Sequence, residues 1–139
     1  MSEAAGARPV PAVTPEMAGF WDAARRHELV AQRCLDCGTF RFPAREVCSR
    51  CLSRRAEWQR VSGRGRVFSL AVMHQANHPW FAARAPYAVV VIELAEGARM
   101  LSSLVGCEPS AIEIGMPVEV AFEDVTAEIT LPVFRPAAG

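Results

Sequence analysis

The sequence predicts a mainly β fold in which a short N-terminal helix and a cysteine-rich ribbon precede a five-stranded barrel. Three observations support this prediction. Four of the five cysteines form two Cys-x-x-Cys pairs that stand ten residues apart. Five segments rich in β-branched and large apolar residues follow the second pair. One segment before the first pair carries apolar residues at helical spacing.

The composition is typical of a globular protein. Of the 139 residues, 51% are hydrophobic and 22% are charged, which argues against disorder except at the ends. Residues 1–13, rich in Ala and Pro, are expected to form a disordered leader. No apolar run approaches the roughly 20 residues of a membrane helix, and there is no secretory pattern. We therefore expect a cytoplasmic protein without membrane contact.

Residues 14–27 are predicted to hold the helix. Thr14 is the expected N-cap, and Pro15 suits the first helical position. The apolar face consists of Met17, Phe20, Trp21 and Ala24. This face packs either on the chain itself or in a groove of a partner. In the second case, the bulky pair Phe20 and Trp21 is the expected contact.

Residues 28–60 are predicted to form a ribbon around a metal ion. The ligands are expected to be Cys34, Cys37, Cys48 and Cys51. Two such pairs supply the four thiolates of a tetrahedral zinc site, with Zn–S bonds of about 2.3 Å, and leave no position open for water. The expected Zn²⁺ is therefore structural. Iron in a rubredoxin-type site uses the same ligands and remains an alternative.

Residues 61–136 are predicted to form a small barrel. The five strands are expected at residues 67–73, 87–94, 99–105, 118–122 and 129–133. Glu96-Gly97 indicates a hairpin between the second and third strands. Residues 109–112 suit a helical turn between the third and fourth strands. This is the order of an oligonucleotide/oligosaccharide-binding (OB) barrel, a five-stranded Greek key.

The charge is unevenly distributed, although the formal net charge is zero. The chain has no lysine, and residues 25–66 hold eleven arginines against four acids. Guanidinium groups bind phosphate and carboxylate groups bidentately. This basic part is therefore expected to face either an anionic ligand or an acidic partner, unless it is only a solvated face. The candidate contacts are Arg41, Arg45, Arg54 and Arg55.

The loop between the first two barrel strands is long enough to suggest a binding role. Trp80 and Phe81 in this loop are candidate anchors in a partner's pocket. His74 and His78 lie in the same loop, but neither has a paired acid nearby in the sequence. No nucleotide-binding, hydrolase or metalloprotease motif is present. We therefore do not expect this chain to be an enzyme by itself.

Several short motifs follow one another along the chain. In the ribbon they are Leu29, Gln32, the two cysteine pairs, Gly38, Phe42-Pro43, Arg45, Trp58, Gly63 and Gly65. In the barrel they are Pro86, Glu93-Leu94, Gly97, Gly115-Met116-Pro117-Val118 and the run from Leu131 to Pro136. Together, from Phe20 to Pro136, these motifs resemble the OB-fold and zinc-ribbon proteins that associate with acyl-CoA enzymes. That family was long catalogued as a domain of unknown function.

The resemblance implies a non-catalytic accessory subunit. Members of this family look like obligate partners of thiolase-fold enzymes that make or break carbon–carbon bonds in acyl-CoA thioesters. Such enzymes include thiolases, polyketide acyltransferases and aldolases that shorten steroid side chains. The resemblance further implies a thiolase-like catalytic subunit as the partner, with two copies of this chain flanking its dimer. A CoA thioester is then the ligand of the complex.

Two other functions remain open. An OB barrel can bind single-stranded nucleic acid through a basic groove and stacked aromatic side chains. The barrel half here is acidic, and Phe68 and Phe122 are expected to face its core, so we expect no nucleic-acid partner. A rubredoxin-like electron carrier is the second possibility, and it requires iron.

Overall fold

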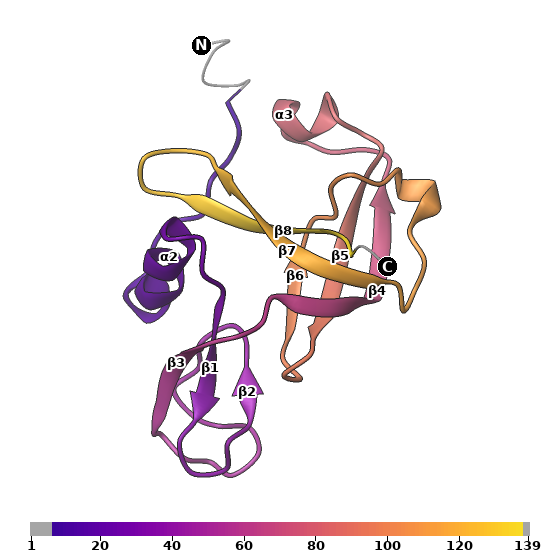
Figure 1. Cartoon of the computed structure of the whole chain (residues 1–139). Coiled ribbons are helices and arrows are strands. Elements are labelled where there is room, and N and C mark those ends of the chain that lie inside the picture. The colour runs from indigo at the N-terminus through magenta and orange to yellow at the C-terminus, as the bar shows by residue number, and fades with distance from the viewer. Residues whose placement is uncertain (1–6, 138–139) are drawn as a thin grey trace.

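The computed structural model describes residues 7–137, and these form two antiparallel sheets with one helix between them (Figure 1). The elements, in chain order, are η1 (Pro15–Met17), α2 (Ala18–Arg25), β1 (Val30–Cys34), β2 (Phe40–Arg41), β3 (Ala56–Arg60), β4 (Arg64–Met73), α3 (Pro79–Ala82), β5 (Tyr87–Leu94), β6 (Arg99–Ser102), η2 (Pro109–Ala111), β7 (Pro117–Asp124) and β8 (Thr130–Pro136). The predicted mainly β class is confirmed. The expected leader lies partly outside the described residues, and residues 7–13 contain no helix or strand.

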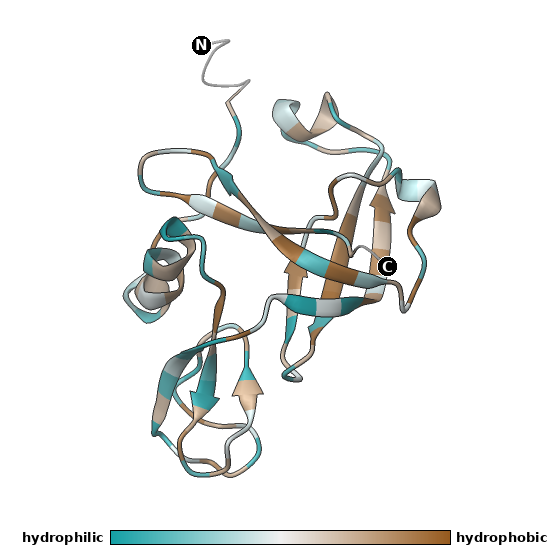
Figure 2. Cartoon of the chain, viewed as in Figure 1, coloured by the Kyte–Doolittle hydropathy of each residue, from teal (hydrophilic) through white to brown (hydrophobic). Residues whose placement is uncertain are grey.

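The ribbon is a three-stranded sheet in the order β2-β1-β3. Gln32 in the central strand pairs with Arg41 on one side and with Trp58 on the other. Figure 2 shows that β1 and β3 carry hydrophilic residues, whereas the barrel strands are mainly hydrophobic. Such a small sheet buries little apolar surface and needs support from the helix and from its cysteines.

The second sheet has the order β6-β5-β4-β7-β8 and curls into a half-open barrel. Leu104, after β6, forms a parallel bridge with Phe134 in β8. Two backbone hydrogen bonds, of 2.8 and 2.9 Å, hold this bridge. The hairpin at Gly97 and the helical turn η2 lie where they were predicted. The strand order and the parallel closure are those of an OB fold, as expected.

A bulge in β4 changes which side chains face the core. The register with β5 shifts between Val67 and Ser69. Val67 is buried, but Phe68 is exposed, and the guanidinium of Arg99 lies 3.7 Å from its ring centroid. The expectation that Phe68 faces the core is therefore wrong, because the bulge turns this position outward.

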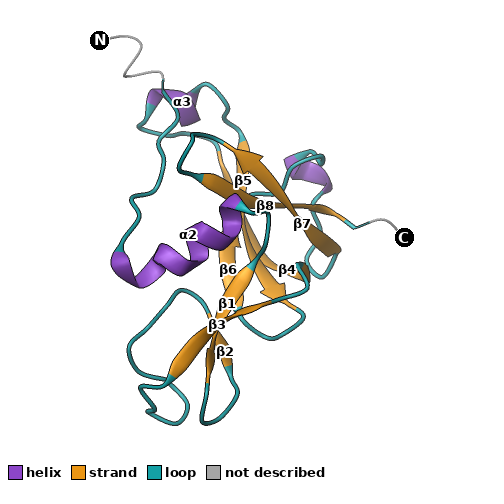
Figure 3. Cartoon of the chain, turned by 60° about the vertical axis from the view of Figure 1, so that its left-hand side comes forward, coloured by secondary structure: helices purple, strands orange, loops and turns teal. Residues whose placement is uncertain are grey.

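Helix α2 connects the two sheets. Pro15 begins the preceding turn as predicted, although the side chain of Thr14 makes no capping hydrogen bond. The helix packs against β1 on one side and β8 on the other (Figure 3). The ring of Phe20 lies 4.9 Å from that of Phe42 and 6.3 Å from that of Trp58, measured between centroids. One continuous core therefore runs from the ribbon through the helix into the barrel.

A second contact fixes the end of the helix to the barrel. The ring of His27 stacks on Phe122, with centroids 5.0 Å apart, and its Nε2 lies 3.0 Å from Oδ1 of Asp124. The hydroxyl of Thr130 donates to the same carboxylate. The hydrogen bond from His27 and then that from Thr130 lower the pKa of Asp124.

Within residues 7–137, no helix has the length and apolar character needed to span a membrane.

Gly65 is required where β4 crosses β5. A Cβ atom at this position would lie 2.5 Å from the carbonyl oxygen of Glu93, a backbone atom that has no room to move. We predict that Gly65→Ala lowers the free energy of unfolding by about 2 to 3 kcal/mol. A Cβ atom at Gly97 would meet no other atom within 4 Å. Gly97→Ala should therefore lower the free energy of unfolding by only about 1 kcal/mol, because φ is positive at this position. Denaturant titration of the metal-loaded proteins measures both, and equal losses would contradict the steric explanation.

Candidate metal centre and surrounding surfaces

The two cysteine pairs lie on two turns with the same backbone hydrogen bonds. In each turn, the first cysteine donates its N–H to the carbonyl five residues later, at 2.9 Å. Its carbonyl accepts from the N–H four residues later, also at 2.9 Å. The residue after the second cysteine has a positive φ in both turns, 76° at Gly38 and 66° at Leu52. Gly38 suits this conformation, whereas a leucine adopts it at a cost.

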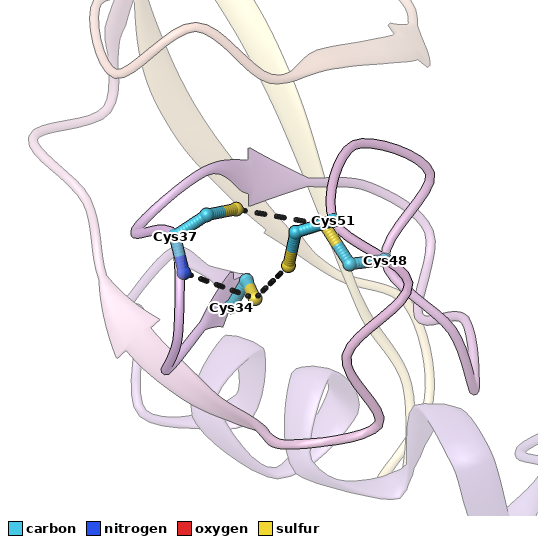
Figure 4. Close-up of side chains that lie close together, drawn as sticks. All are labelled: Cys34, Cys37, Cys48 and Cys51. Atoms are coloured by element: carbon cyan, nitrogen blue, oxygen red, sulfur yellow. Dashed lines mark hydrogen bonds between the residues drawn. The ribbon is translucent and has the colours of Figure 1, made fainter.

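The four cysteine sulfurs point toward one another (Figure 4). Sγ of Cys34 lies 3.6 Å from Sγ of Cys51, and Sγ of Cys37 lies 3.6 Å from Sγ of Cys48. All four lie within 4.8 Å of one another. The edge of a zinc–thiolate tetrahedron is about 3.8 Å, and a disulfide is about 2.05 Å long. The cysteines are therefore positioned for one tetrahedral metal ion.

Backbone N–H groups favour the thiolate form at two of these positions. The N–H of Cys37 lowers the pKa of Cys34 to about 6. The N–H of Cys51 similarly lowers the pKa of Cys48. At Cys51 the N–H of Ser53 also acts to lower the pKa, but burial and the three neighbouring sulfurs raise it to about 12. Four thiolates this close repel one another, so a bound dication is needed to hold them all deprotonated.

The structure brings together three of the four candidate arginines. Arg41, Arg45 and Arg54 line one pocket of about 440 Å³ on the ribbon. Arg55 does not line it, because its Nη1 lies 2.8 Å from Oδ1 of Asp36 on the first cysteine turn. Arg54 and Arg55 are adjacent in the sequence, but they belong to different surroundings.

The two helix aromatics also have different surroundings. Phe20, a candidate partner contact, is 2% exposed and part of the core, which agrees with the alternative that the helix face packs on the chain itself. Its burial reflects contacts with both the ribbon and the barrel, which the helix periodicity alone does not reveal. Trp21 is half-buried and lines an apolar groove of about 280 Å³, together with Phe42, Leu101 and Leu131. This groove lies between the helix, the ribbon and the barrel.

Trp80 and Phe81 lie on the short helix α3 within the predicted loop. The guanidinium of Arg84 lies 3.5 Å from the Trp80 ring centroid, and that of Arg8 lies 4.8 Å from it. Arg8 also forms an ion pair with Glu123. Arg8 lies in the segment that was expected to be a disordered leader, and no pattern in the sequence predicts its contacts with the barrel. Nδ1 of His78 accepts the N–H of Trp80 and so caps this helix.

Comparison with known proteins identifies the family. The model "ChsH2, rubredoxin-like zinc ribbon domain" matches residues 21–57, and the model "ChsH2, C-terminal OB-fold domain" matches residues 58–123. A DUF35 domain-containing scaffold protein of Methanocaldococcus jannaschii is 41% identical over 102 residues, which cover 72% of this chain and 71% of that protein. The chain belongs to the DUF35 family. Its OB fold and zinc-ribbon module are thus confirmed.

Two other relatives are longer than this DUF35 protein, and their names describe them as hydratase subunits. A "Probable enoyl-CoA hydratase alpha subunit" of Thermomonospora curvata is 43% identical over 94% of this chain. The chain spans only 40% of the length of that relative. A "3-oxo-4,17-pregnadiene-20-carboxyl-CoA hydratase alpha subunit" of Mycobacterium tuberculosis is 37% identical, over 82% of this chain and 36% of that protein.

Two solved structures resemble this DUF35 protein. A chain of an "Ltp2-ChsH2(DUF35) aldolase" has a TM-score of 0.82 and 42% identity, and the match covers 93% of this chain and all of that one. A DUF35 protein of Sulfolobus solfataricus has a TM-score of 0.62 at 14% identity, with 90% of this chain and 87% of that one covered. The second likeness shows the fold alone.

We predict that the protein binds about one zinc ion per chain, because its four sulfurs fill one tetrahedron. Cys34→Ser should lose the metal and unfold the ribbon, whereas Cys107→Ser should keep it, because Cys107 lies outside the cluster. Elemental analysis combined with native mass spectrometry measures the stoichiometry. One iron and no zinc in protein from its natural host would contradict this prediction and support an electron carrier.

We predict that Leu52→Gly raises the free energy of unfolding of the metal-loaded protein by about 0.5 to 1 kcal/mol. The substitution relieves the positive φ and removes little packing, because Leu52 is 75% exposed. Leu35→Gly is the matched control on the other turn, where φ is not positive. Leu35→Gly should lower the free energy of unfolding. Changes of the same sign for the two variants in denaturant titrations would refute the explanation.

Proposed function

We propose that this DUF35 protein is a non-catalytic accessory subunit of an acyl-CoA enzyme whose catalytic subunit has a thiolase fold. The main support is the likeness to the DUF35 chain of the Ltp2-ChsH2 aldolase over its whole length, at 42% identity. The scaffold-protein description of the archaeal relatives supports the same role. Among carbon–carbon bond enzymes, an aldolase acting on steroid-type acyl chains is favoured over a thiolase by the relatives' names.

The proposed role assigns no chemistry to the cysteine cluster. Four thiolates complete the coordination of a tetrahedral ion, so Zn²⁺ bound there has no position for water or substrate. Two of the three histidines have structural contacts, since His78 caps a helix and His27 links α2 to the barrel. The metal supports function by holding the ribbon in one conformation. Bond making and breaking belong to the partner.

The surface proposed to meet the partner is the apolar groove beside Trp21. It combines Leu101, which is 67% exposed, with half-buried aromatic side chains from the helix and ribbon. An exposed apolar group beside a preformed groove is typical of a protein interface. Trp80 and Phe81 remain candidate contacts, and Arg8 lines both their pocket and the groove. We further propose two copies of the chain per catalytic dimer, and a cytoplasmic location.

The arginine-rich ribbon is proposed to lie toward the charged part of the complex. Its anionic counterpart is either the phosphate groups of the CoA thioester or an acidic surface of the partner. Both possibilities follow from the same guanidinium chemistry. Arg41, Arg45 and Arg54 share one pocket and are the stronger candidates, while Arg55 already has Asp36 as its counterion.

One observation favours nucleic-acid binding, because Phe68 is exposed on the barrel surface beside Arg66 and Arg99. However, both guanidinium groups donate to the carboxylate of Glu93, at 2.7 to 3.2 Å. The hydrogen bond from Arg66, followed by that from Arg99, keeps the pKa of Glu93 low. A single aromatic ring with neutralised arginines is a poor platform for a single strand. We therefore retain the accessory-subunit proposal.

Co-expression with a thiolase-like protein from the same genome tests the proposal. We expect a stable complex by size-exclusion chromatography with light scattering, and no acyl-CoA turnover by this chain alone. Leu101→Asp should weaken the complex about tenfold, since it places a charge in the apolar groove. Ile114→Asp is the matched control, because Ile114 is similarly exposed but lies outside the groove. Turnover by the isolated chain, or no complex at all, would refute the proposed function.

A further inference from the structure

Three arginines of the ribbon converge on one pocket whose occupant is unassigned. Arg41 extends from β2, Arg45 follows it in the next turn, and Arg54 precedes β3. Two carboxylates, those of Glu16 and Glu46, line the same pocket. Its volume of about 440 Å³ is enough for a side chain or a small anion.

The guanidinium of Arg41 is held in place by neutral acceptors. Its Nε donates to Oε1 of Gln32 at 2.6 Å, and its Nη2 donates to the carbonyl oxygen of Arg45 at 2.8 Å. The backbone N–H of Arg45 donates to the same oxygen of Gln32 at 3.0 Å, which locks the turn around the guanidinium. The positive charge is thus oriented before any ligand binds, and orientation in advance reduces the entropy cost of binding.

Arg41 still has unused hydrogen-bonding capacity. Its Nη1 is buried and has no hydrogen-bond partner among residues 7–137. A buried donor on a charged group is costly when it lacks an acceptor. Within the same residues, Arg41, Arg45 and Arg54 form no ion pair, although seven other arginines do. Arg41 thus has a donor without an acceptor, and the exposed Arg45 and Arg54 add positive charge to the same pocket.

The charge of the pocket selects the kind of anion. Three guanidinium groups and two carboxylates leave one positive charge. A phosphate monoester carries nearly two negative charges at pH 7 and would lie close to both glutamates. A carboxylate carries one charge, and its two oxygens match the spacing of a guanidinium fork. The composition of the pocket therefore favours a carboxylate.

We infer that this pocket binds a single carboxylate, supplied by an Asp or Glu side chain of the catalytic partner. The source of the carboxylate rests on the proposed function, but the site itself does not. A charge pair at this position would fix the orientation in which the ribbon docks, because an arginine held in advance accepts a carboxylate from few directions. The apolar groove would supply most of the buried area.

The first experiment tests the site on the metal-loaded full chain without a partner. The Nε–H signal of Arg41 in an isotope-labelled sample is followed by NMR, and Arg41→Lys identifies it by its loss. Sodium acetate is titrated at constant ionic strength, because salt screens exposed charges. We expect a saturable shift of this signal. Arg54→Gln should weaken acetate binding about two- to fivefold.

Arg55→Gln is the matched control. It removes the same charge from the adjacent residue, but Arg55 lies outside the pocket and pairs with Asp36. It should leave acetate binding unchanged. An unsaturable response to acetate, or equal effects of the two substitutions, would refute the site. Tighter binding of inorganic phosphate or CoA than of acetate at the same ionic strength would overturn the assignment to a carboxylate.

The second experiment tests the source of the carboxylate in the co-expressed complex. Arg54→Gln should weaken association with the catalytic subunit about two- to fivefold relative to Arg55→Gln. Arg54→Glu should lose affinity for the catalytic subunit. Replacement of the contacting Asp or Glu of the partner with arginine should restore that affinity. If acetate binds but both variants retain the partner equally, the site stands and its role in docking is refuted. If acetate binds and no complex forms with wild-type chain, the proposed function fails while the anion site remains.

Discussion

The packing of Phe20 is the contact on which the arrangement of this protein depends. Its ring lies against Phe42 and Trp58 of the ribbon, and the same residue belongs to the core that continues into the barrel. The ribbon sheet cannot bury a core by itself, and α2 is too short to be stable alone. The ribbon and the helix stabilise each other, and the helix also packs on β8. The helix therefore fixes how the ribbon sits relative to the barrel.

The cysteine cluster rigidifies the opposite end of the ribbon. Cys34 ends the central strand β1, and the three strands of the ribbon are bounded by the two cysteine turns. A metal ion shared by both turns would tie together segments that are otherwise linked only by short strand pairings. The arginine pocket is lined by Glu16 of η1 and by Glu46 and Arg54, which flank the second cysteine pair in the sequence. Both segments therefore border the pocket.

The distribution of charge is consistent with a protein that docks in one orientation. The arginines of the barrel surface are largely neutralised, as the shared carboxylate of Glu93 shows. Among the described residues, most arginines without an ion pair lie in the ribbon, and three of them line its pocket. An apolar groove provides affinity without much directionality, whereas a charge pair provides directionality with modest affinity. The proposed accessory role calls for both, because such a subunit would have to orient its partner.

The sequence by itself determined the local features. The spacing of the four cysteines indicated one metal site. Segments rich in β-branched and large apolar residues located the five barrel strands to within a few residues, and apolar residues at helical spacing located the helix. These signals are local, because they reflect backbone geometry that nearby residues set. Resemblance to the family, and no local pattern, supplied the expectation of an accessory subunit.

Tertiary structure alone decided which of these residues meet. Phe68 faces outward because a bulge shifts the register of β4, and Phe20 is buried because two sheets close around the helix. Arg54 and Arg55 are neighbours with the same chemistry, yet only Arg54 lines the pocket, whereas Arg55 pairs with Asp36 on the first cysteine turn. Register and packing arise from contacts between distant segments. No pattern within one segment of the sequence contains that information.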